Sequence, residues 1–314
     1  MTVLASSAPV PQTRNLGVGV LAGLAAGALW GMVFVVPRMT PGLSSVDLTA
    51  GRFVSYGAMA ALVMAFTWHK HRRPSLTQAS SAVGMSLLGA TGYYLLLALS
   101  IGAAGSEVPT LIIGTIPIWV MLLGKPQGLK WAALLPGLLL TAAGLGLMMQ
   151  HGLSTAGAGR AVGQDFWWGV VMALAAMVSW TAFALLNAAW LRRHPQVSAT
   201  EWSNWLGIAT GLGALLLWLL MGSEPKELLA LDGKLFIAIV CVATGIGSGW
   251  AASILWNVAS KRLSVSLCGQ LIVSETLFGL VYSFAWDGHW PALVQWSAAL
   301  LFTLGILASI QAHR

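Results

Sequence analysis

The sequence predicts an all-α integral membrane protein with ten transmembrane helices, arranged as two inverted five-helix repeats around a central cavity. Three observations lead to this prediction. Of the 314 residues, 57% are hydrophobic and only 8% are charged, with a mean hydropathy of +0.80. A soluble chain carries about a quarter charged residues, so this chain cannot cover a water-facing surface. Apolar runs of bilayer-spanning length recur along the chain, and a segment of the first half returns in the second.

The repeated segment covers residues 21–39 and 171–190. A Leu-Ala-Ala triplet precedes Trp30 and Trp180 at the same spacing, and a phenylalanine follows each tryptophan with the spacing slipped by one residue. Neither segment has a polar face, so neither suits a soluble strand or a surface helix. Each is long enough to cross a bilayer.

Polar breaks divide the apolar sequence into ten expected spans. Helices are expected because backbone polar groups inside a bilayer must be satisfied within the segment. The spans are 16–37, 46–67, 79–102, 106–123, 130–150, 166–190, 198–221, 233–258, 263–284 and 291–311. They give an N-terminal cytoplasmic tail (1–15), a first repeat (16–150), an external linker (151–165) and a second repeat (166–311).

The loops predict the orientation. Eleven basic residues fall on one side of the membrane, and four fall on the other side together with most of the acids. Because cytoplasmic loops carry the excess of lysine and arginine, both termini are expected in the cytoplasm of a cell bounded by a bacterial-type inner membrane. Five spans per repeat is an odd number, so the second repeat must enter from the opposite side. Inverted repeats of this kind are typical of transporters, whose substrate site lies where the repeats meet.

Several short motifs resemble one transporter superfamily. They are ALWG-x-x-F at residues 28–34, Arg52-Phe53, a proline in the fourth span, and GLLLTAAGLGLMM at residues 137–149. The chain is similar in these motifs to the drug/metabolite transporter (DMT) superfamily, EamA type. Its length, its aromatic content and an HRRP turn most resemble YddG-type exporters of aromatic amino acids. The resemblance implies ten helices in two inverted halves, with a cavity lined mainly by spans one, three, four, six, eight and nine.

Two charged residues lie well inside expected spans, where charge is costly and needs a reason. Glu275 is expected to meet the ammonium group of a substrate or to take part in proton coupling, and a purely structural acid is the alternative. Arg52 has three open interpretations: it contacts the substrate, extends its charge to the interface, or pairs with Asp47.

Aromatic and polar residues complete the candidate substrate-binding site. Rings with a polar edge suit a flat apolar solute, and a cation can rest on their faces. The candidates are Trp30, Tyr93, Tyr94, Trp180 and Trp250, with Thr110, Asn187 and Asn257 as hydrogen-bonding partners. Packing between helices is the alternative role for each of them.

Two prolines interrupt the fourth span. Pro109 and Pro117 each remove a backbone donor, which frees the carbonyl groups of Gly105 and Ile113. A freed carbonyl facing a cavity can accept a hydrogen bond from an ammonium group. Whether the two bends move as a gate or are fixed stays open.

The remaining motifs exclude several function classes. No glycine run is followed by the lysine and hydroxyl residue of a nucleotide-binding loop, and the histidines suggest no metal site. We therefore expect no enzyme, metal, cofactor or nucleic-acid partner. The predicted function is a secondary transporter that exports aromatic or other neutral amino acids by alternating access. Efflux of lipophilic cations or another metabolite is the alternative, and a membrane-embedded enzyme is the least favoured one. A monomer contains both halves, and a dimer stays open.

Overall fold

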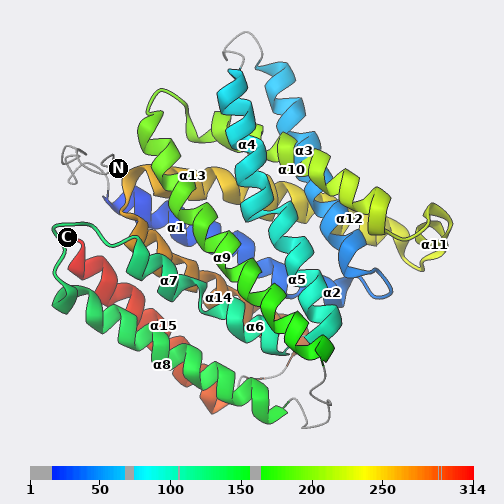
Figure 1. Ribbon diagram of the computed structural model, residues 1–314. Helices are drawn as coiled ribbons and strands as arrows, with labels where there is room; N and C mark the ends of the chain where they lie inside the picture. Colours follow the sequence, from blue (N-terminus) through cyan, green and yellow to red (C-terminus); the bar gives the residue numbers. More distant parts are fainter. Residues whose placement is uncertain (1–15, 68–73, 105–106, 156–163, 289, 291) are drawn as a thin grey trace.

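The computed structural model describes residues 16–67, 74–104, 107–155, 164–288, 290 and 292–314 (Figure 1). These residues form helices and connecting turns without any strand, which confirms the all-helical prediction. Within them, nine helices are long and apolar enough to cross a membrane, and Ile112–Leu123 is a shorter apolar helix. The expected N-terminal tail lies outside the described residues, as do residues 156–163 of the expected linker.

In the first half of the chain, the described residues form eight α-helices and one 3-10 turn. They are α1 (Leu16–Gly31), η1 (Met32–Phe34), α2 (Val36–Met39), α3 (Ser45–Phe66), α4 (Leu76–Gly89), α5 (Thr91–Ala104), α6 (Glu107–Gly114), α7 (Ile116–Leu123) and α8 (Trp131–Thr155). The expected third span is interrupted at Ala90, between α4 and α5, and the fourth at Thr115, between α6 and α7.

The part of the second half that the structure describes forms seven α-helices and one π-helical segment. They are α9 (Gln164–Arg193), α10 (Ala199–Met221), α11 (Pro225–Ala230), α12 (Lys234–Thr244), η3 (Gly245–Ala251), α13 (Ala252–Arg262), α14 (Val265–Asp287) and α15 (Leu293–Ala312). The expected eighth span is one continuous path through α12, η3 and α13, with the π-helical turn at its centre.

Serine side chains begin four of the long helices. Ser44, Ser198 and Ser264 each accept a hydrogen bond from the backbone N–H three residues later, at 3.1, 3.0 and 3.1 Å. Ser75 forms a reciprocal capping box with Gln78. These caps satisfy donors that the first helical turn would leave unpaired, so the polar breaks in the sequence fix where the helices start.

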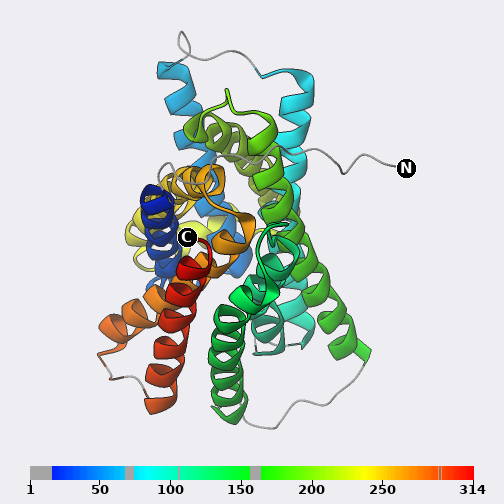
Figure 2. The same ribbon diagram turned by 90° about the vertical axis from the view of Figure 1, so that its left-hand side faces the viewer.

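The helices pack as a bundle in which elements from both halves alternate. Both views have α3 and α4 at one edge and α8 with α15 at the opposite edge, and α1, α5, α9, α13 and α14 lie between them (Figures 1 and 2). The largest helix pairings are α3 with α10, α8 with α15, α5 with α9, and α1 with α13 and α14. The two halves are therefore interleaved rather than side by side.

Two glycines allow α3 and α10 to approach closely. A Cβ atom added at Gly57 would lie 2.7 Å from the Cα atom of Gly211, and one added at Gly211 would lie 2.8 Å from the Cα atom of Gly57. Small residues at such a crossing let two backbones meet within a membrane. The crossing therefore depends on both positions being glycine.

Replacing Gly57 with valine should destabilise the protein by about 1–3 kcal/mol, the usual cost of overpacking. The added methyl groups would force α3 away from α10. The melting temperature of the purified variant in detergent measures the effect. Gly84→Val is the matched control, since a Cβ atom there meets nothing within 4 Å. Equal melting temperatures for the two variants would contradict the assigned contact.

Candidate substrate-binding site

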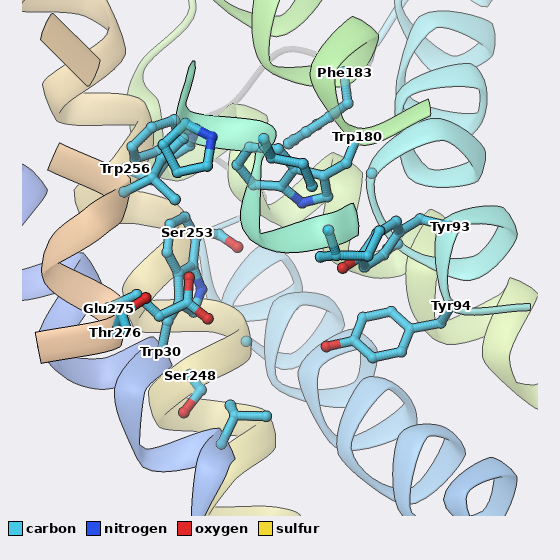
Figure 3. Close-up of a pocket in the computed structure, with 18 of the residues that line it drawn as sticks. Trp30, Tyr93, Tyr94, Trp180, Phe183, Ser248, Ser253, Trp256, Glu275 and Thr276 are labelled. Carbon is cyan, nitrogen blue, oxygen red and sulfur yellow. The ribbon is translucent and has the colours of Figure 1, made fainter. Parts of the chain in front are cut away.

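A cavity of about 580 Å³ lies at the centre of the bundle. Its volume falls within the usual range of small-molecule sites, about 300–1,000 Å³. Helices of both halves supply its walls: α1, α3, α4, α5, α6, α7 and α8 from the first half, and α9, α10, η3, α13, α14 and α15 from the second. Figure 3 shows side chains of the two halves facing one another across it.

Three tryptophans and a phenylalanine form one wall of the cavity, here called the tryptophan wall. The ring centroids of Trp30 and Trp256 are 5.3 Å apart, those of Trp256 and Trp180 are 6.4 Å apart, and those of Trp180 and Phe183 are 6.0 Å apart. These separations lie within the range in which aromatic rings attract one another. The wall runs from α1 through α13 to α9, so it joins the two halves.

A second aromatic cluster faces the side of the cavity that holds Trp30 and Glu275 (Figure 3). Tyr94 packs edge-on against Phe53 and Tyr93, with centroid distances of 5.0 and 5.1 Å. The hydroxyl groups of Tyr93 and Tyr94 point across the cavity toward the side of Glu275 and Trp30 (Figure 3). A solute between the two clusters would therefore meet ring faces as well as phenolic hydroxyls.

Two charged side chains, Glu275 of α14 and Arg52 of α3, line the cavity. No hydrogen bond or ion pair to another described residue is found for the Glu275 carboxylate or for the Arg52 guanidinium. The expected alternative of an Arg52–Asp47 pair is wrong. Asp47 is bound instead by Ser44, Trp218 and Ser223, with Trp218 Nε1 donating over 3.1 Å and Ser223 Oγ over 2.7 Å.

Helix irregularities cluster around the cavity. The lining includes residues at the two helix interruptions: Ala90 between α4 and α5, and Gly114 and Ile116 on either side of the break between α6 and α7. The π-helical turn contributes Ser248 and Gly249, and Ser248 Oγ donates to the Leu29 carbonyl over 2.6 Å. π-Helical turns occur frequently at functional sites.

Most of the sequence-predicted site residues gather at the cavity. Those that line it are Trp30, Tyr93, Tyr94, Trp180, Asn257, Glu275 and Pro117. Pro117 stands at the start of α7 and lacks an N–H, so the carbonyl of Ile113, another lining residue, loses its usual donor. Pro109 is buried away from the cavity, and the side chain of Thr110 lies outside the described residues.

Asn187 and Trp250 do not line the cavity, contrary to the expectation for them. Asn187 is completely buried, donating to Asn257 Oδ1 over 2.9 Å and accepting from Trp202 Nε1 over 2.7 Å. Trp250 donates through Nε1 to Asn204 over 2.8 Å. Both are therefore occupied in contacts between helices of the second half, the alternative role expected for polar and aromatic residues in a bundle.

Several lining residues were not among the predicted ones. They are mainly Phe53, Tyr56, Phe183, Ser248, Ser253 and Thr276. For Phe183 a signal existed, because it follows Trp180 as Phe34 follows Trp30, and both phenylalanines line the cavity. Ser253 and Thr276 carried no comparable pattern.

The described residues contain no group of three or more histidine, cysteine or acidic side chains that could hold a metal ion. Cys241 and Cys268 are buried and unpaired. No side-chain arrangement around the cavity points to a cofactor.

Comparison with known proteins identifies relatives. No family model matches the chain. The chain is 30% identical over 322 aligned positions to the inner membrane protein YtfF of Escherichia coli (strain K12), across 94% of this chain and 95% of that protein. The chain belongs to the YtfF family. It is thus a multi-pass protein of an inner membrane family, which agrees with the localisation expected from the sequence.

A solved crystal structure shares the fold of this YtfF-family chain. It superposes with a TM-score of 0.73 at 21% sequence identity, across 93% of this chain and 97% of the other. The bundle is therefore an arrangement that another protein adopts, and the likeness extends over nearly the whole of both chains.

Polar contacts between helices lie beside the cavity of this YtfF-family chain, next to the lining residue Asn257. There Asn257 Nδ2 donates to Ser203 Oγ over 2.8 Å beside Asn187, and Lys261 Nζ donates to the Val197 carbonyl over 2.5 Å. Leu267 and Leu271 of α14 are fully buried below them. The lining also includes Phe34 at the end of η1, whose side chain is 48% exposed.

Proposed function

We propose that the protein is a secondary transporter that exports small neutral amino acids, aromatic ones above all, across the inner membrane by alternating access. The observation that carries this proposal is the central cavity, to which both halves of the chain contribute aromatic rings. Sites at the meeting of two halves are the rule in transporters of this kind.

The chemistry of the cavity wall favours a zwitterion with a flat side chain. The tryptophan wall and the Tyr93–Tyr94 cluster provide ring faces, while Glu275 and Arg52 provide one charge of each sign. A dianionic solute would leave charge unmatched, and an unpaired ion in a low-dielectric site costs several kcal/mol. The charges of a zwitterion balance those of the wall.

We further propose ten transmembrane helices in two inverted repeats, as in the DMT superfamily, EamA type. The helix contacts support this arrangement. Helices α3 with α10, α7 with α14, and α8 with α15 pair an element with its counterpart in the other half. The pairings of α1 with α13 and α14 are matched by those of α9 with α5 and α6. Exchanging the halves maps this pattern onto itself, as a two-fold axis between inverted repeats requires.

Both termini are proposed to be cytoplasmic, because eleven basic residues of the sequence fall on the side expected for the termini and only four fall on the other side. The end of α13 that carries Lys261 would then lie toward the cytoplasm. Alternating access requires a second state in which the Asn187–Asn257–Ser203 contacts open.

Counterflow in proteoliposomes tests the proposed function. Vesicles loaded with unlabelled phenylalanine should accumulate labelled phenylalanine or tryptophan in preference to aspartate, glutamate or a sugar phosphate. Empty vesicles and vesicles with a heat-denatured preparation are the controls. Preferential movement of a sugar phosphate would contradict the proposal, and chemical change of the solute would favour an enzyme.

Efflux of a lipophilic cation is the second candidate, because Glu275 in an aromatic cavity also suits a cation. Arg52 on the same wall weighs against it, since a cation would meet like charge. Tetraphenylphosphonium in the same counterflow assay decides between the two. Its movement without phenylalanine movement would favour cation efflux.

A further inference from the structure

Arg52 is a buried cation without a partner in the described part of the chain. Its side chain is 5% exposed and lines the cavity, and its Nε atom has no hydrogen-bonding partner. An uncompensated charge away from water costs several kcal/mol. An unpaired charge inside a membrane bundle therefore suggests that a ligand binds there and neutralises it.

Neither of the acidic residues near Arg52 forms an ion pair with it. Asp47, five residues earlier on α3, accepts its hydrogen bonds from Ser44, Ser223 and Trp218. Glu275 lines the same cavity as Arg52, yet no ion pair within 4 Å joins the two described side chains. The cavity thus presents one cation and one anion that are near each other but not bound together.

The position of Arg52 is set by backbone packing. A Cβ atom at Gly245 would collide with the Arg52 carbonyl oxygen and would lie 2.6 Å from Ser55 Cβ. Glycine at the start of the π-helical turn therefore lets η3 rest directly on α3, beside the cavity-lining residues Ser248 and Gly249. This contact fixes the helix from which the guanidinium extends.

We propose that Arg52 binds the α-carboxylate of the amino-acid substrate while Glu275 binds its ammonium group. This inference rests on the proposed function. A planar guanidinium offers parallel N–H donors that match a carboxylate. With its head group between α3 and α14, the substrate directs its side chain along the tryptophan wall formed by Trp30, Trp256, Trp180 and Phe183.

Ligands that differ only in the carboxylate test this assignment. Purified wild-type protein, Arg52→Gln and Arg52→Lys are assayed for binding of labelled phenylalanine, with unlabelled phenylalanine and phenylalaninamide as competitors. The amide retains the ammonium group and the ring but lacks the negative charge. Wild type should prefer phenylalanine at least about tenfold, since hydrogen bonds to charged groups are strong.

Arg52→Gln should bind phenylalanine about tenfold more weakly and phenylalaninamide unchanged, so that the preference disappears. Arg52→Lys should restore part of it, because lysine keeps the charge without the planar fork. Arg262→Gln is the control: Arg262 donates to the Val258 carbonyl at the end of α13, does not line the cavity, and should leave the preference intact.

Two results would overturn the assignment: equal competition by both ligands in wild type, or a tenfold preference that survives in Arg52→Gln. Equal weakening of both ligands in Arg52→Gln would assign a structural role to Arg52. If wild type neither binds nor transports any neutral amino acid, the proposed function itself fails. The outcomes therefore separate a wrong assignment of Arg52 from a wrong assignment of the transporter. Should Arg52→Gln not fold, the wild-type and Arg52→Lys measurements still decide.

Discussion

Glutamine in place of Glu275 should lower phenylalanine transport at least about tenfold. The substitution keeps the shape of the side chain and removes its charge, so an ammonium group in the cavity loses its ionic partner. Hydrogen bonds to charged groups contribute about 1.5–3 kcal/mol each, and 1.4 kcal/mol corresponds to a factor of ten. Initial rates of counterflow, measured over a range of phenylalanine concentrations, give the change.

Glu201→Gln is the matched control for this variant. Glu201 lies in the first turn of α10, outside the cavity lining, so its replacement should leave the rate unchanged. The ammonium group is common to both binding probes, so Glu275→Gln should weaken phenylalanine and phenylalaninamide together, unlike Arg52→Gln. Wild-type rates for Glu275→Gln would leave Glu275 as a structural acid.

The helical architecture followed from the sequence because the bilayer imposes it. Apolar runs of sufficient length have one stable form in lipid, and serine caps at Ser44, Ser75, Ser198 and Ser264 mark where helices begin. The helix interruptions at Ala90 and Thr115 were harder to predict from the sequence. A proline at position 117 indicated a break in the fourth span. The break in the third span lies at Ala90, and an alanine does not force a break in a helix.

The residues that line the cavity could be predicted only in part from the sequence. Trp30 and Trp180 were marked by the repeat, and Glu275 by its charge, and all three line the cavity. Asn187 and Trp250 were also predicted, as a polar and an aromatic residue in cavity spans, yet both form contacts between helices.

The physical reason is that these spans have apolar residues on every side. In a soluble helix the polar face shows which side meets water. Here one side meets lipid and another meets a largely aromatic cavity, so the sequence does not distinguish them. Arg52 illustrates the difficulty. It does not pair with Asp47, because Trp218 and Ser223 donate hydrogen bonds to the Asp47 carboxylate, and both are distant from it in the sequence.

Alanine in place of Trp180 should reduce transport of phenylalanine and tryptophan about tenfold, and transport of alanine much less. Trp180 stands in the middle of the tryptophan wall, within 6.4 Å of the Trp256 ring and 6.0 Å of the Phe183 ring. Its removal takes away ring surface that an aromatic substrate would cover, and aromatic pairs contribute about 0.5–1.5 kcal/mol beyond the area they bury. The ratio of phenylalanine to alanine counterflow measures this selectivity.

Loss of packing must be separated from loss of substrate contact, since truncating a large buried side chain can cost about 3–5 kcal/mol. Monodispersity in detergent establishes that Trp180→Ala is folded, and Trp180→Phe should recover most of the selectivity because it restores a ring. Trp168→Ala is the matched control, for Trp168 lies on the same helix, α9, is 59% exposed and does not line the cavity. If folded Trp180→Ala keeps the wild-type ratio, the tryptophan wall packs the bundle and does not select the substrate.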